Sequence, residues 1–137
     1  MNNENQIKLF NNHQIRTLWD KDKEEWFFSI IDVIAILTNS PHPRTYWSKL
    51  KTKLKNEGSE LYQNWVQLKM PATDGKMRLT DVADTKGILR IIQSISSPNA
   101  EPFKLWLAQI GHERLDEIAD PQLSVERAIS NYMNIVF

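Results

Sequence analysis

Residues 42–55 read HPRTYWSKLKTKLK, and the organisation of the chain can be worked out from this stretch outward. It contains five of the 17 lysines and arginines of the chain and no acidic residue. On a helix that advances about 100° per residue, Trp47, Leu50 and Leu54 lie on one side. The remaining surface carries basic and hydroxyl side chains: Arg44, Thr45, Ser48, Lys49, Lys51, Thr52, Lys53 and Lys55. The stretch predicts an amphipathic helix with one packing face and one basic face.

A basic, hydroxyl-rich helix face suits duplex DNA for a physical reason. Lys and Arg displace condensed counterions from phosphates, and short Ser and Thr side chains can approach the backbone or the base edges closely. The same pattern is typical of an ordinary solvated helix whose lysines only keep a protein in solution. This stretch alone does not distinguish a DNA-binding helix from a solvated one, and the remaining residues of the chain are needed to do so.

A shorter apolar helix is expected directly before the basic one. Ser29 and Asp32 form an S-x-x-D start motif ahead of an apolar run that ends at Asn39. The two prolines of the next four residues, SPHP, forbid a continuous helix, and Pro43 suits the first position of the second helix. Two helices joined by a four-residue turn have the spacing of a helix-turn-helix-like pair.

Strands are expected on both sides of this helix pair. Before it, three short apolar runs between residues 7 and 28 predict a small antiparallel meander, and the polar residues 1–6 are expected to be frayed. After it, alternating runs flank Asp74-Gly75, which predicts a β-hairpin with these two residues at its tip. Lys69, Lys76 and Arg78 make the hairpin a second basic element, which could meet phosphates or simply face solvent.

Two apolar helices are expected to complete the core. Thr80 or Asp81 is the predicted cap of the first, and the second is predicted over residues 101–118. The expected fold is α+β, with small antiparallel strands and a β-hairpin packed with four to five helices, including the helix-turn-helix-like pair. We expect one domain over residues 7–118, followed by a helical extension, residues 119–137, of a longer protein.

Composition excludes several classes of protein. A chain of 137 residues with 41% hydrophobic and 25% charged residues fits one soluble globular domain. Without cysteine it can have neither a disulfide framework nor a thiol nucleophile. No apolar run approaches the length of a bilayer span, so we expect a cytoplasmic protein without membrane contact. The net charge is zero, but the charged residues are distributed unevenly. Residues 38–55 contain five basic and no acidic residues, whereas residues 101–137 contain six acidic and three basic residues.

No pattern of catalytic or metal-binding residues stands out. His13, His42 and His112 have no partners at the spacing of metal ligands. Asp81 and Asp84 lie three residues apart, as a catalytic carboxylate pair could, but each has an explanation as a helix cap. The four glycines form no phosphate-binding loop. We expect neither enzymatic activity nor a metal or cofactor.

The order of several motifs resembles the amino-terminal domain of the BRO family, which occurs in phage antirepressor-like proteins, bacterial proteins and large DNA viruses. The resemblance covers about residues 7–118. It rests on KLFNNHQIRTLW at residues 8–19, on the W-F and D-V pairs of the module WFFSIIDV at residues 26–33, on Pro43-Arg44, and on FKLWL at residues 103–107. These motifs are individually common, and their order and spacing together are specific.

The resemblance implies an α+β domain that binds double-stranded DNA through Arg44 and the lysines of the helix that follows. Together with the residue pattern, it predicts a phage-type regulatory module whose site is Arg44, Thr45, Ser48, Lys49, Lys51, Thr52, Lys53, Lys55, Lys69, Lys76 and Arg78. The alternative is a protein-interaction module of the antirepressor kind, which would titrate a repressor or recombination protein through its apolar or acidic surfaces, and the acidic end after Glu101 motivates it. A homodimer is also among the expected assemblies.

Overall fold

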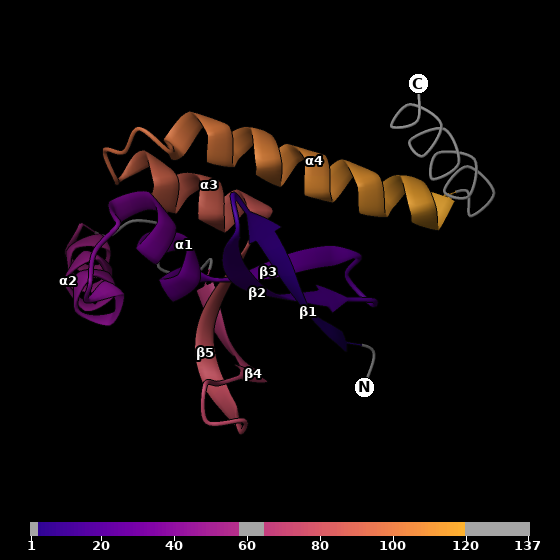
Figure 1. The fold of residues 1–137 in the computed structure, drawn as a ribbon, viewed down its shortest axis with the longest axis horizontal. Helices are drawn as coiled ribbons and strands as arrows, with labels where there is room; N and C mark the ends of the chain where they lie inside the picture. The colour runs from indigo at the N-terminus through magenta and orange to yellow at the C-terminus, as the bar shows by residue number, and fades with distance from the viewer. Residues whose placement is uncertain (1–2, 58–64, 120–137) are drawn as a thin grey trace.

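The computed structural model describes residues 3–57 and 65–119, which form an α+β fold of five strands and four helices (Figure 1). The strands are β1 (Asn3–Phe10), β2 (His13–Asp20), β3 (Glu25–Ser29), β4 (Trp65–Pro71) and β5 (Met77–Asp84). The helices are α1 (Ile30–Thr38), α2 (Pro43–Asn56), α3 (Thr85–Gln93) and α4 (Ala100–Ala119). The expected fold class is confirmed, whereas the predicted extension over residues 120–137 lies outside the described residues.

Strands β1, β2 and β3 form the predicted antiparallel meander. Asn11 and Asn12 both have positive φ, 47° and 68°, as a two-residue hairpin turn requires, and Asn tolerates this conformation well. The prediction of a frayed terminus over residues 1–6 is wrong for residues 3–6. These residues extend β1, because β2 continues to Asp20 and offers them partners.

The meander and the β4–β5 hairpin belong to one sheet with the strand order β1-β2-β3-β5-β4. The hairpin joins the meander through an antiparallel pairing of β3 with β5, in which Phe28 lies opposite Ala83. Both residues are fully buried. The sequence predicts the two units separately but not their union, since pairing between distant strands leaves no local pattern.

The first helix after the hairpin begins later than predicted. Neither Thr80 nor Asp81 caps it; both lie within β5. Asp84 is the cap, and its carboxylate accepts a hydrogen bond of 2.8 Å from the backbone N–H of Gly87. The strand continues because Val82 and Ala83 are buried in the sheet, which outweighs the capping propensity of the preceding residues.

Helices α3 and α4 lie side by side over one face of the sheet, and α1 and α2 lie at its end, as Figure 1 shows. The main core lies between the sheet and these helices, where Phe28, Ile34, Ile88 and Phe103 have no exposed surface. The β4–β5 hairpin projects from this body, away from α3 and α4. Its outer half is therefore open on the side of α2.

Helices α1 and α2 are joined by residues 39–42, as predicted. The hydroxyl of Ser29 caps α1 by accepting from the N–H of Asp32, and Asn39 ends it in the left-handed conformation. Pro43 is the first residue of α2, where its missing N–H costs nothing. The two helices are present, and their use as a helix-turn-helix unit stays a prediction.

Candidate nucleic-acid interface

Helix α2 has the two faces that its sequence predicts. Trp47, Leu50 and Leu54 are buried in the main core. The side chains on the remaining surface are exposed, with one exception: Arg44, Thr45, Ser48, Lys49, Thr52, Lys53 and Lys55 are exposed, and Lys51 is half-buried. Most of the predicted site residues of this helix are therefore accessible to a large ligand.

Lys51 is held by Asp81, at the inner end of the hairpin. One oxygen of the Asp81 carboxylate accepts hydrogen bonds of 2.8 Å from both Lys51 Nζ and Trp47 Nε1. The other oxygen accepts from Gln67 Nε2 at 3.1 Å. The indole rings of Trp47 and Trp65 also meet edge to face, 5.2 Å apart. These contacts fasten α2 to both strands of the hairpin, so that helix and hairpin form one surface.

The carboxyl group of Asp81 is ionised more readily than that of an ordinary aspartate. Its burial raises the pKa, but hydrogen bonds from Lys51, Trp47 and Gln67 and the positive charge of Lys51 outweigh this effect. The net result is a pKa below the usual value. The junction between α2 and the hairpin is thus strongest when Asp81 is charged.

This junction is expected to make the stability of the domain depend on pH. Because the pKa of Asp81 is lower in the folded chain, its contribution is complete above the unfolded pKa of about 3.9 and is lost as the pH falls through the folded pKa. We expect Asp81→Asn to lower the free energy of unfolding by about 1–2 kcal/mol at neutral pH. Urea unfolding at a series of pH values would measure this loss, which should shrink towards zero in acid. A loss that is equal at all pH values would contradict the assignment.

The basic residues of α2 fall on two flanks. Arg44 lies on the flank that faces the hairpin and lines a hollow of about 200 Å³ together with Arg78, Leu79 and Asp81. Helical spacing places Ser48 and Lys55 on this same flank. Lys49 and Lys53 lie on the opposite flank, beside Ser94 at the end of α3. The structure therefore brings Arg44, but not Lys49 and Lys53, together with the hairpin.

The hairpin has the predicted turn and the predicted basic residues. Gly75, at its tip, has a φ of 81°, which a residue with a side chain adopts only with strain. Lys69, Lys76 and Arg78 are all exposed. Arg78 forms an ion pair with Asp74, which holds the pKa of that carboxyl below its usual range.

Two exposed apolar side chains of strand β5 were not predicted as site residues. Met77 is 48% exposed and Leu79 is 63% exposed. Both are on strand β5, in alternation with Arg78, and Leu79 lies directly opposite Lys69. The signal was present in the sequence, since a strand that buries Thr80 and Val82 on one side turns residues 77, 79 and 81 to the other.

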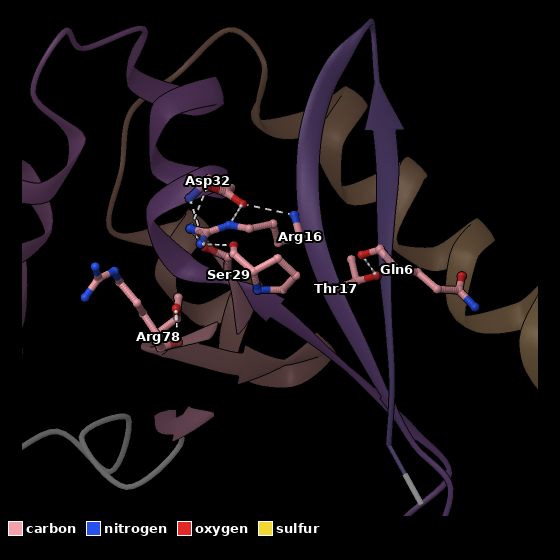
Figure 2. Close-up of polar contacts among 8 residues, drawn as sticks. Gln6, Arg16, Thr17, Ser29, Asp32 and Arg78 are labelled. Atoms are coloured by element: carbon pink, nitrogen blue, oxygen red, sulfur yellow. Dashed lines mark hydrogen bonds and ion pairs between the residues drawn. The ribbon is translucent and has the colours of Figure 1, made fainter. Parts of the chain in front are cut away.

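Arg16 is a second residue that the sequence did not single out. Its guanidinium reaches from β2 to the start of α1, where Nε donates to Asp32 at 2.9 Å and Nη2 donates to Ser29 at 3.1 Å (Figure 2). Its backbone N–H donates to the same carboxylate at 2.9 Å. Nη1 donates to the carbonyl of Pro71 in β4 at 3.1 Å. One side chain therefore ties β2, α1 and the hairpin together.

The contact between Arg16 and Pro71 also reveals a curled sheet. Strands β2 and β4 are separated by β3 and β5 in the strand order, yet they touch. Leu18, Phe27, Met70 and Val82 fill the inside of this curl as a second, smaller core. The curl sets the angle at which the hairpin leaves the body, and hence its position beside α2.

The described part of the chain holds no group of three His, Asp or Glu side chains that could bind a metal ion. His13 and His42 are exposed, and the side chain of His112 lies outside the described residues. None of the described helices combines the length and the apolar character that crossing a membrane requires.

Comparison with known proteins gives one match. The family model described as the BRO family, N-terminal domain, matches residues 14–113. No curated protein and no solved structure matches the chain. The matched residues run from β2 into α4 and include all of α2 and the hairpin.

Proposed function

Since this chain belongs to the BRO family through an N-terminal domain at residues 14–113, we propose that it is a DNA-binding regulatory module of the phage or mobile-element, antirepressor-like type. Its role in this proposal is to bind duplex DNA, with no catalytic step. The bound surface is the hairpin-facing flank of α2 together with the β4–β5 hairpin. We call this the basic surface, and it comprises Arg44, Ser48, Lys55, Lys69, Lys76 and Arg78.

One observation carries the proposal: Asp81 fastens α2 to the hairpin, and thereby places two separate basic elements side by side. The chain has no net charge, so attraction to DNA has to come from such local clustering. Arg44 and Arg78 line one hollow between the two elements. A helix whose lysines only keep the protein in solution would not need to be fixed to a second basic element. The contact with the hairpin therefore favours DNA binding over the interpretation of α2 as an ordinary solvated helix.

Contacts with phosphates are expected to dominate the affinity. The lysines and arginines of the basic surface can each neutralise a phosphate and release counterions, irrespective of the DNA sequence. The hydroxyl groups of Thr45 and Ser48 are short enough to donate to the backbone as well, whereas the hydroxyl of Thr52 donates to the carbonyl of Ser48 at 3.1 Å. Lys51 and Arg78 contribute less in this proposal, because they already neutralise Asp81 and Asp74.

Binding to a mixed-sequence duplex, measured by fluorescence anisotropy over a salt series, tests the proposal. With roughly four to six phosphate contacts, a plot of log affinity against log salt should have a slope of about −4 to −5. The measurement needs only the chain as it stands and a labelled duplex. Absence of binding even at low salt would contradict DNA binding.

Protein binding is a second candidate function, and an observation on strand β1 favours it. In the described part of the chain this strand is at one edge of the sheet, where one of its backbone carbonyls, that of Leu9, accepts a hydrogen bond of 2.9 Å from Trp106 Nε1 in α4. Ile7 and Leu9 on it are 56% and 58% exposed. An apolar edge strand can add a strand from a partner, such as a second copy of the chain, a repressor or a recombination protein. If no duplex is bound, this candidate takes precedence.

A further inference from the structure

The exposed apolar residues of strand β5, Met77 and Leu79, lie on the same side as α2. In the register of β4 and β5, Gln67 lies opposite Asp81, Lys69 opposite Leu79, and Pro71 opposite Met77. Alternate residues of a strand share a face, and Asp81 on this face contacts α2. Leu79 and Met77 therefore continue the α2 side of the hairpin towards its tip, where no described helix covers them.

Basic side chains surround this apolar strip. Lys69 lies directly across from Leu79, and Lys76 follows at the turn. The nearest carboxylate at the tip, Asp74, is already paired with Arg78. A surface that combines an apolar centre with a basic border is complementary to a DNA groove, where apolar sugar and base edges lie between two rows of phosphates. Apolar wedges bordered by Lys and Arg are used in this way in the minor groove.

We propose that the hairpin enters the minor groove next to the major groove that receives α2, and that Leu79 and Met77 pack against sugars and base edges there. This inference rests on the proposed DNA binding and adds a contact that involves no charge. A strand advances about 3.4 Å per residue, so Leu79 and Met77 lie roughly 7 and 14 Å beyond Asp81 along β5. Neighbouring groove centres are separated by half a helical turn, roughly 17 Å, so Met77 reaches furthest towards the minor groove.

Leu79→Thr is the variant that tests the inference, because threonine removes the apolar contact and retains the preference for a strand. At 63% exposure, Leu79 contributes little to the core, so the variant should fold. We expect the affinity for an AT-rich duplex to fall about tenfold, with an unchanged salt slope, since no phosphate contact is lost. The double variant Lys69→Gln/Lys76→Gln should instead reduce the slope by about 2. Leu105→Gln, at the 73% exposed leucine of α4, is the matched control and should bind as the unmodified chain does.

Netropsin, which fills the minor groove of AT-rich DNA, provides the second measurement. Saturating the duplex with it should weaken the unmodified chain about tenfold and weaken Leu79→Thr much less. Unchanged binding of the unmodified chain to netropsin-filled DNA would overturn the minor-groove assignment. Equal affinities of Leu79→Thr and the unmodified chain would overturn the apolar contact, and a loss of self-association in that variant by ultracentrifugation would assign the strip to protein binding. The netropsin result and the affinity of Leu79→Thr are both measured on a chain that binds DNA. These two results are therefore distinct from a failure of DNA binding itself.

Discussion

Replacement of both Arg44 and Lys55 by glutamate is expected to weaken duplex binding on the order of 100-fold at moderate salt. Both residues lie on the flank of α2 that faces the hairpin, where the proposal places the phosphates. Each substitution removes one counterion-releasing contact and adds a charge that repels DNA, which is expected to cost about one order of magnitude in affinity per site. Fluorescence anisotropy with the mixed-sequence duplex measures the loss, and the salt slope should become shallower by about 2.

The matched control is the double variant Lys49→Glu/Lys53→Glu. It makes the same change of charge in the same helix, but on the flank beside Ser94. Both pairs include one residue of the last turn of α2, Lys53 or Lys55, so the effect at the carboxyl end of the helix dipole is the same. Arg44→Glu lies in the first turn, where a negative charge is favourable, so a loss of binding in that pair does not come from a weakened helix. At the ionic strength of a cell, charges more than about 8 Å from a phosphate are largely screened. We therefore expect only a several-fold loss. Equal losses for the two pairs would show that the hairpin-facing flank has no special role.

Replacement of Asp32 by alanine is expected to lower the free energy of unfolding by about 2–3 kcal/mol. The carboxylate accepts hydrogen bonds from the backbone N–H and the guanidinium of Arg16, at 2.9 Å in both cases. Removal of one partner of a buried ion pair costs about 3–5 kcal/mol. Here the side chains of Arg16 and Asp32 keep 20% and 19% of their surface exposed, so water compensates part of the loss. Chemical denaturation at neutral pH measures the difference.

Lys104→Ala is the control for this ion pair. Lys104 pairs with Glu101 on the surface of α4 at 3.0 Å, and the Glu101 side chain is 80% exposed. Such pairs contribute less than about 0.5 kcal/mol, and alanine suits a helix, so stability should barely change. If Asp32→Ala were as mild as Lys104→Ala, Arg16 would not be the residue that ties the sheet to α1 and the hairpin.

Several elements could be predicted because their information is local. Ser29 caps α1, Asn11-Asn12 and Gly75 lie in two of the hairpin turns, and Pro43 begins α2. Each depends on contacts within a few residues along the chain. The two faces of α2 follow from the helical repeat alone, which is why its buried residues were identified correctly.

The candidate site could be predicted only as a set of basic residues. The sequence does not distinguish Lys51 from the other lysines of α2. In the structure Lys51 differs from them because it binds Asp81, 30 residues away along the chain. The structure also places Arg44 on the flank of α2 that faces the hairpin, and Lys49 and Lys53 on the flank beside Ser94 at the end of α3. The apolar residue Leu79 was missed because strand periodicity shows which residues share a face but not whether another element covers that face.

By itself, the sequence determined most elements of this protein, several of their caps and turns, and the basic character of α2 and the hairpin, whereas the start of α3 and the length of β1 were decided by strand pairing. Only the tertiary structure decided that β3 pairs with β5, that Arg16 reaches Pro71 over 55 residues, and that Asp81 fastens the hairpin to α2. The physical reason is the range of the interactions. Turns, caps and helix faces depend on neighbours in the chain, whereas the basic surface exists only because distant segments share buried strands and ion pairs.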